Sequence, residues 1–376
     1  MARSSHTDRC PGALQVHQAA DGALARIRLP GGVLTAPQLA ELARLSAEYC
    51  SGTIELTARA NLQLRSVRDV EAVGSALAEI GLLPSASHER VRNIVASPLS
   101  GRSGGRTNVR PWVTELDAAL QADPELTGLG GRFWFSLDDG QSDVSGLGAD
   151  LGVQVFDAGP RLLLAGRDTG IEVPAGQVAA ELIALARRFL RIRGDAWRVA
   201  ELPDLHLLHP GVVLGPPMPA VTRPPVGWIS QDRPPGAVAL GAAVPLGVLA
   251  SRTAQFLAAI DKPLVITPWR SVLVCDLDDG VADVALRVLA PMGLVFDESS
   301  PWLSVSACTG SPGCAKSAAD VRGTATTMVQ AAQSGGPTPL PGGGHRHFVG
   351  CDRACGSPPG AQVLVATAEG LRSRRP

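Results

Sequence analysis

The stretch Ile54–Arg65, IELTARANLQLR, alternates apolar and polar residues along its whole length. Alternation with a period of two is typical of β-strands, whose successive side chains point to opposite faces. One face is therefore predicted to pack on a core. The other face either lines a ligand-binding cleft or meets water, as one side of an antiparallel sheet often does. This second face carries the polar side chains Glu55, Thr57, Arg59, Asn61, Gln63 and Arg65.

A second copy of this pattern occurs in the C-terminal half of the chain. The segments that begin at Gly32 and at Gly247 both predict a helix, a strand, a turn, a strand and a helix, in that order. Arg59 in the first copy is matched with Arg270 in the second. We expect the two copies to pair about a pseudo-twofold axis, so that their polar strand faces line one cleft. The alternative is a chance likeness between two ordinary α+β units.

The remaining sequence predicts two further modules. Strands are expected within 131–140 and 161–170, and an amphipathic helix over Gln177–Ile192. The predicted fold class is therefore α+β. Four domains are expected, namely a first half repeat at 10–88, a central α+β domain at 89–215, a second half repeat at 222–300 and a C-terminal α+β domain at 301–371.

Composition and charge restrict the function. The 376 residues carry a formal net charge of −1, so no field of one sign attracts the whole molecule to nucleic acid or to membranes. The N-terminal segment has no apolar run typical of a signal peptide. The most apolar stretch, Gly236–Ala250, is too short for a membrane span and contains Pro245. We therefore expect a cytoplasmic protein that binds neither nucleic acid nor membranes.

Four of the seven cysteines lie near the C-terminus. Five residues separate Cys308 from Cys314, and three separate Cys351 from Cys355. Zinc sites usually have shorter spacings, whereas a [4Fe–4S] cube needs four thiolates spread around a larger perimeter. A cluster is the favoured interpretation, and the alternatives are structural zinc and unrelated cysteines. Cys50 and Cys275 are expected in the core. Cys10 has no predicted role.

These motifs resemble those of the siroheme-type nitrite/sulfite reductase superfamily over nearly the whole chain. The CX5C…CX3C spacing resembles its cluster motif, LTARANLQLR resembles its first-repeat strand, and ERVRNIVASP (Glu89–Pro98) resembles its next tetrapyrrole-binding segment. The resemblance implies two ferredoxin-like half repeats and a cluster held by Cys308, Cys314, Cys351 and Cys355. Together with the polar strand face and the repeat, it gives the candidate tetrapyrrole-binding residues Arg59, Asn61, Gln63, Arg65, Arg92, Asn93, Arg132 and Arg270.

One strand departs from the reductases. Their strand carries two lysines that handle the anionic substrate and its protons, whereas GRFWFSLDDG has Arg132 and Trp134 in these places. The motifs CPG (Cys10–Gly12), RVRNIVASPLSG and ACTGSPGCAKSAADVR are similar to those of the precorrin-3B synthases within the superfamily. That family's reaction is the O2-dependent hydroxylation of precorrin-3A at C20 with γ-lactone formation, in aerobic cobalamin biosynthesis. The alternatives are a siroheme-containing sulfite or nitrite reductase and a non-catalytic zinc module.

The resemblance to the precorrin-3B synthases implies further components. They are a [4Fe–4S] cluster, a mononuclear non-haem iron and an electron-donating reductase that uses NADH. A separate reductase is expected because no GxGxxG motif follows a predicted strand in this chain. Siroheme is expected only under the reductase alternative. Histidines and carboxylates are the expected iron ligands. His345 and His347 would share one face of a strand before Cys351, but the sequence leaves the iron ligands unassigned.

Overall fold

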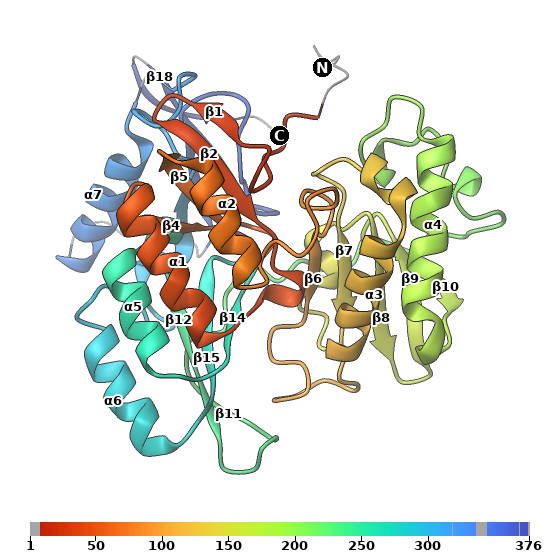
Figure 1. Cartoon of the computed structure of the whole chain (residues 1–376), viewed down its shortest axis with the longest axis horizontal. Coiled ribbons are helices and arrows are strands. Elements are labelled where there is room, and N and C mark those ends of the chain that lie inside the picture. The colour runs from red at the N-terminus through yellow and green to blue at the C-terminus, as the bar shows by residue number, and fades with distance from the viewer. Residues whose placement is uncertain (1–7, 318, 336–343, 368, 375–376) are drawn as a thin grey trace.

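The computed structural model describes residues 8–317, 319–335, 344–367 and 369–374. Four β-sheets and the helices that cover them form the molecule (Figure 1). No described helix combines the length and the apolar character that a membrane crossing needs. The α-helices are α1 (Ala36–Tyr49), α2 (Val70–Glu79), α3 (Arg110–Ala122), α4 (Val178–Ile192), α5 (Ser251–Ala259), α6 (Asp279–Leu289) and α7 (Val321–Gln333).

The two repeats form two sheets of the same design. The first sheet has the order β1 (His17–Ala19), β2 (Gly22–Ile27), β5 (Leu62–Val67), β4 (Thr53–Leu56) and β13 (Val248–Ala250). The second has the order β11 (Gly227–Ser230), β12 (Val238–Ala243), β15 (Ser271–Leu277), β14 (Leu264–Ile266) and β3 (Val33–Leu34). The predicted order of helix, strand, turn, strand and helix is confirmed in both copies, and so is the ferredoxin-like, pseudo-twofold α+β architecture.

The two repeats exchange their edge strands. The strand β13 belongs to the second repeat but pairs with β4 of the first, with Leu249 opposite Ile54. In return, β3 of the first repeat pairs with β14 of the second, with Leu34 opposite Leu264. Each sheet is therefore completed by a strand from the other copy.

Two glycines make this exchange possible. Gly32 and Gly247 precede the exchanged strands and have φ values of 71° and 72°, in the left-handed region that disfavours side chains. A Cβ atom on Gly32 would lie 2.0 Å from the carbonyl oxygen of Ile266, at the end of β14. A Cβ atom on Gly247 would lie 3.0 Å from the carbonyl oxygen of Leu56, at the end of β4. The backbones approach too closely at both crossings for a larger residue.

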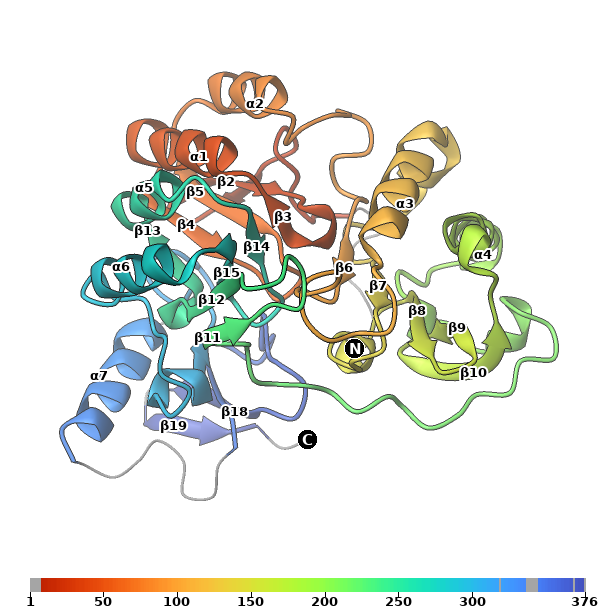
Figure 2. The same ribbon diagram turned by 90° about the horizontal axis from the view of Figure 1, so that it is seen from below.

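The helices of the two repeats bury one common core. The N-terminus of α1 is fixed by a capping box, in which Thr35 and Gln38 bond each other's backbone N–H groups. Leu39 and Leu42 of α1 and Leu257 of α5 are fully buried in the same apolar cluster. The helices α1, α2, α5 and α6 lie on one side of the two sheets (Figures 1 and 2). The polar faces of the strands therefore look to the other side.

The structure corrects the register of the repeat. The turns between β4 and β5 and between β14 and β15 have the same hydrogen bonds. Their fourth residues are Ala60 and Arg270, with positive φ values of 54° and 58°. Arg59 therefore corresponds to Trp269, and the predicted match of Arg59 with Arg270 is wrong by one residue. Alternation identifies a strand but does not fix the position of the turn within it.

A central module and a C-terminal module complete the fold. The central sheet has the order β10 (Arg167–Glu172), β9 (Gly159–Leu164), β8 (Leu151–Phe156), β7 (Phe135–Asp138) and β6 (Ile94–Ala96), and it shares an apolar core with α3 and α4. The C-terminal sheet has the order β16 (Val305–Ala307), β17 (Arg346–Val349), β18 (Gln362–Thr367) and β19 (Gly370–Ser373), and it packs on α7. The predicted strands and helix of the central module are confirmed. The exact domain boundaries stay a prediction.

Candidate functional site

An open cavity of about 570 Å³ lies where the two repeats meet the central and C-terminal modules. All six polar residues of the opening stretch line it, from Glu55 to Arg65. The polar strand face therefore looks into a cavity rather than into open water. Three of these side chains are almost fully buried, namely Glu55, Asn61 and Arg65.

Six arginines surround the cavity, namely Arg26, Arg59, Arg65, Arg198, Arg270 and Arg322. Three of them form ion pairs, which are Arg65–Asp21 at 2.7 Å, Arg198–Asp150 at 2.7 Å and Arg322–Glu55 at 2.6 Å. In the described part of the chain the other three have only uncharged partners. Arg26 donates to the Gln63 side chain at 2.9 Å, and Arg270 donates to the Gly356 carbonyl at 3.0 Å. Arg59 is 3.5 Å from the Gly131 carbonyl and lies over the Trp134 ring at 5.9 Å.

The cations without carboxylate partners are electrostatically strained. Burial, and next the neighbouring cations Arg198 and Arg26, lower the pKa of Arg59 to about 10. Burial also lowers the pKa of Arg26 and of Arg270. A buried cation without a counter-ion loses hydration and gains nothing in return. An anion in the cavity would remove this penalty, so the arrangement suits a ligand with several carboxylates.

The structure brings most of the predicted binding residues together. Arg59, Asn61, Gln63, Arg65, Asn93 and Arg270 all line the cavity. Arg92 does not, because its guanidinium group turns to α3 and binds both carboxylate oxygens of Asp117, at 2.7 and 2.8 Å. Arg132 also lies outside the lining and is exposed in the turn before β7.

Sequence reasoning missed several cavity residues. Arg26 lies on β2 directly opposite Gln63 of β5, and the alternation of arginines in ARIR was a usable signal. Arg198 and Arg322 come from a loop and from the first turn of α7, where no sequence pattern marks them. Three tryptophans complete the wall, namely Trp134, Trp269 and Trp302. Their rings offer flat apolar surface for a macrocycle.

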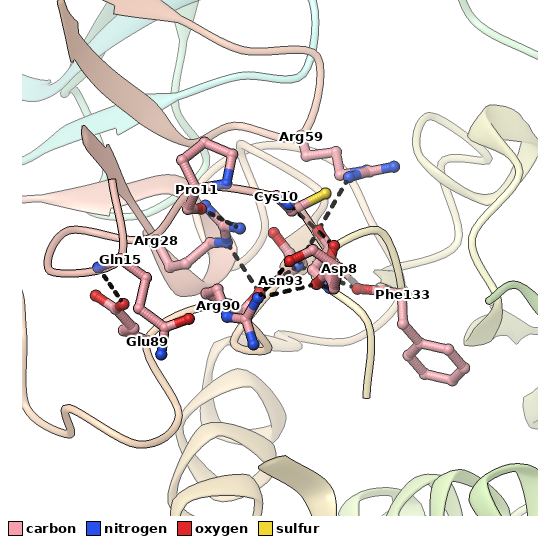
Figure 3. A network of polar contacts seen from close by, with 11 residues as sticks. Asp8, Cys10, Pro11, Gln15, Arg28, Arg59, Glu89, Arg90, Asn93 and Phe133 are labelled. Atoms are coloured by element: carbon pink, nitrogen blue, oxygen red, sulfur yellow. Dashed lines mark hydrogen bonds and ion pairs between the residues drawn. The ribbon is translucent and has the colours of Figure 1, made fainter. Parts of the chain in front are cut away.

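Asn61 and Asn93 have a mainly structural place in this wall. The Asn61 side chain accepts from the Leu29 N–H at 2.9 Å and donates to the Asn93 side chain at 3.0 Å. The Asn93 amide lies within 3.1–3.2 Å of three backbone carbonyls, those of Arg90, Gly131 and Phe133. Their amide groups are therefore engaged in holding β5, β6 and the loop before β7 in place. Figure 3 shows Asn93 beside Arg90 and Phe133.

The N-terminal segment is fastened beside this wall (Figure 3). The buried Glu89 carboxylate accepts the backbone N–H groups of three successive residues, Ala13, Leu14 and Gln15, at 2.7–2.9 Å. Cys10 packs against Gly131, where a Cβ atom would lie 2.6 Å from the Cβ of Cys10. Burial, and next the nearby Asp8, raise the pKa of the Cys10 thiol.

The four C-terminal cysteines lie next to the cavity. Cys308 follows β16 and Cys351 follows β17, and these strands are parallel neighbours, so their ends place both residues side by side. The Gly350 N–H donates to the Cys308 sulfur at 3.4 Å. Desolvation raises the pKa of Cys355, and the nearby thiols of Cys308, Cys351 and Cys314 raise it further. The other three thiols are therefore within electrostatic reach of Cys355, which itself lines the cavity.

The spacing of these thiols has chemical consequences. Within the described residues, no three His, Cys, Asp or Glu side chains converge as ligands of one metal ion. A zinc site needs four sulfurs at about 2.3 Å from a single ion. Thiolates are soft ligands that suit either zinc or an iron–sulfur cube. The other predicted cysteine positions are also seen, because Cys50 and Cys275 are buried in apolar clusters.

His345 directly precedes β17 and His347 lies on it, and both rings turn to the same neighbour. Both approach the hydroxyl of Ser306 on β16, His345 through Nε2 at 2.7 Å and His347 through Nδ1 at 2.8 Å. The Nε2 atom of His347 is 2.9 Å from the Cys355 carbonyl. Burial, and next the Arg270 cation, lower the pKa of His345 to about 4 and that of His347 to about 3. Both rings are therefore neutral near pH 7.

Comparisons with known proteins agree with this architecture. Residues 17–80 match the nitrite/sulfite reductase ferredoxin-like half domain. The chain is 27% identical to a precorrin-3B synthase of Sinorhizobium sp over 96% of this chain and 81% of that protein. It is 24% identical to a ferredoxin–nitrite reductase of Synechococcus elongatus over 92% of this chain and 76% of that protein. A sulfite reductase of Mycobacterium tuberculosis is 24% identical, and the chain covers 62% of its length.

The solved structure of the Mycobacterium tuberculosis NirA protein has the same fold. It superposes with a TM-score of 0.74 over 89% of this chain and 69% of that chain, at 21% identity. The fold is therefore that of nitrite and sulfite reductases, and the relatives are oxidoreductases or related enzymes. The predicted resemblance to the superfamily, and to precorrin-3B synthase within it, is confirmed.

Proposed function

We propose that this chain, which has the nitrite/sulfite reductase fold and resembles precorrin-3B synthase, is a tetrapyrrole-modifying oxidoreductase. Its reaction is the O2-dependent hydroxylation of precorrin-3A at C20 with γ-lactone formation, in aerobic cobalamin biosynthesis. The observation that carries this proposal is the set of three cavity arginines without carboxylate partners, Arg26, Arg59 and Arg270, next to four gathered thiols.

The cavity suits a macrocycle that carries several carboxylates. A well-placed arginine–carboxylate bond contributes about 1.5–3 kcal/mol. Arg26, Arg59 and Arg270 come from three different strand ends or turns, so they would hold separate carboxylates and fix the orientation of the ring. Gln63 lies opposite Arg26 on the neighbouring strand and would add a neutral hydrogen bond. Trp134 and Trp269 would pack against the apolar faces of the macrocycle.

The four thiols would hold the redox group. Cys308, Cys314, Cys351 and Cys355 would bind a [4Fe–4S] cluster, which supplies single electrons when bound. The chain's own part is to keep this group beside the substrate cavity, since Cys308 and Cys355 belong to both. A mononuclear non-haem iron, whose ligands are unassigned, and an NADH-using reductase as electron donor complete the proposal. We also propose that the chain acts in the cytoplasm.

The second candidate is a siroheme-containing sulfite or nitrite reductase, which the similarity to such enzymes favours. One experiment separates the two. The protein is purified without oxygen, and its visible spectrum, iron and sulfide are measured on one sample. The proposed function expects iron and sulfide without macrocycle bands, and turnover of precorrin-3A only with O2 and an electron donor. Tightly bound siroheme together with sulfite or nitrite reduction would overturn it, and zinc without iron or sulfide would overturn both candidates.

A further inference from the structure

We propose that His345 is a proton-exchanging residue of the cavity, and that Ser306 and His347 hold its ring in position. The inference rests on the proposed function in one respect, namely that the ligand is an anionic tetrapyrrole. His345, Ser306 and Leu303 all line the cavity. His345 directly precedes β17, and Ser306 of β16 is paired in register with His347 of β17.

The hydrogen bonds of this group define which nitrogen carries the proton. The Cys355 carbonyl can only accept, so the Nε2 atom of His347 must donate to it. The Nδ1 atom of neutral His347 is then an acceptor, and the Ser306 hydroxyl donates to it. Because this uses the only proton of Ser306, its oxygen must accept from Nε2–H of His345. The remaining nitrogen of His345, Nδ1, is therefore the basic one.

The hydrogen-bonded group of His345, Ser306 and His347 can accept one more proton, at Nδ1 of His345. A backbone interaction with Leu303 favours the protonated form of His345, because it raises the pKa of the ring. Protonation at Nδ1 gives the ring a second donor without breaking its bond to Ser306. In the empty cavity this form is opposed by burial and by the Arg270 cation. The ring is thus held in place, neutral at rest and next to a space for anions.

An anionic ligand changes this balance. The charged and titratable groups that act on His345 are His347 on β17 and Arg270 in the turn before β15. Arg270 is in turn influenced by Arg322, Glu55 and Cys308, which also line the cavity, as does Cys355. A ligand carboxylate paired with Arg270 would neutralise the cation that disfavours protonation of His345. Binding would therefore raise the pKa of His345 from about 4 and take up a proton. Within the window between the free and the bound pKa, affinity would rise as the pH falls.

The proposed reaction needs such a group. When one oxygen atom of O2 is added to the substrate and the other leaves as water, the electron donor supplies two electrons and the cavity must supply two protons. Protonated His345 would give one proton to the oxygen that leaves as water and would then be reprotonated from solvent. Ser306 and His347 are positioning residues in this scheme, because they orient the ring of His345 through their hydrogen bonds and give no proton to the ligand.

The test measures proton uptake on binding. Uroporphyrin III, a stable tetrapyrrole polycarboxylate, is titrated calorimetrically into the cluster-loaded protein near pH 6, in buffers of different ionisation enthalpy. The wild-type chain is expected to take up part of one proton, with affinity rising up to about tenfold per pH unit as the pH falls. H345Q keeps a donor toward Ser306 and should lose this uptake. S306A should reduce it, and the control H206Q, which changes an exposed histidine outside the cavity, should leave it intact.

The outcomes are distinguishable. Equal proton uptake by H345Q and wild type, with both binding the probe, would overturn the role of His345 and leave the proposed function standing. No binding of the probe by the wild-type chain would overturn both. If H345Q does not fold, unchanged uptake in S306A together with a ligand-independent NMR titration of His345 would reject the inference.

Discussion

Arg59 and Arg92 provide a matched test of the cavity. Both are arginines near the polar strand faces, but Arg59 lines the cavity without a carboxylate partner, whereas Arg92 is buried against Asp117. We predict that R59A weakens tetrapyrrole binding and leaves folding unchanged. R92A is expected to destabilise the fold and to leave tetrapyrrole binding unchanged. The comparison separates the loss of a ligand contact from the loss of a structural ion pair.

The expected magnitudes follow from the contacts. Loss of one charge-assisted carboxylate bond costs about 1.5–3 kcal/mol, which weakens binding roughly 10- to 150-fold. Arg59 has a lowered pKa of about 10, so its charge does not stabilise the empty fold. R59A should therefore change the free energy of unfolding by no more than about 1 kcal/mol. R92A leaves the Asp117 carboxylate without its cation and should cost about 3 kcal/mol of stability.

The assays are titration of fluorescence quenching by uroporphyrin III and urea unfolding followed by circular dichroism. The linear dependence of unfolding free energy on urea gives the stability difference directly. Equal affinity of R59A and wild type would refute the claim that the polar strand face binds the ligand. A large loss of stability in R59A would mean that Arg59 is a structural residue like Arg92.

Three further predictions concern other parts of the chain. C314S should lose both iron and sulfide after anaerobic reconstitution, and full retention of both by elemental analysis would remove that thiol from the cluster. E89A should lower the free energy of unfolding by about 3 kcal/mol, because three backbone N–H groups lose a charged acceptor; an unchanged urea midpoint would contradict this. Burial, and next Asp138, raise the pKa of Asp143 to about 7, so folding favours its protonated form and the wild type loses stability as the pH rises from about 4 to 7. The stability advantage of D143N over wild type should therefore grow across this range, and a constant difference in urea midpoints would disprove the assignment.

The sequence predicted the strand face but not every partner of its residues. Strict alternation placed Gln63 of β5 correctly because a strand leaves each side chain only two directions. Arg59 also lines the cavity, but it lies in the turn between β4 and β5, where a strand pattern does not fix the direction of a side chain. It could not show that Asp117, on a helix distant in sequence, would bind Arg92 and draw it away from the cavity. It also misplaced the turn around Arg270 by one residue, since a slip of one position keeps the same apparent pattern.

The thiols and the histidines were easier to anticipate than the remaining cations. Cys308 and Cys351 lie together because they follow neighbouring parallel strands, and their spacing already suggested a shared group. His345 and His347 are two residues apart, a spacing that favours one face of an extended segment, although β17 itself begins only at Arg346. Arg198 reaches the cavity from a loop, where no periodicity exists to predict the direction of a side chain.

The reciprocal exchange of β3 and β13 bears on how this receptor could arise. If a half repeat stood alone, it would present an unpaired strand edge, so two copies would have to associate by trading that segment. Such a symmetric dimer would present identical side chains to both ends of a bound macrocycle. Fusion into a single polypeptide frees the two turns to diverge, and here one bears Arg59 while its counterpart bears Trp269. The protein can then bind an asymmetric macrocycle in one orientation and reject the flipped one, which two identical halves could not do.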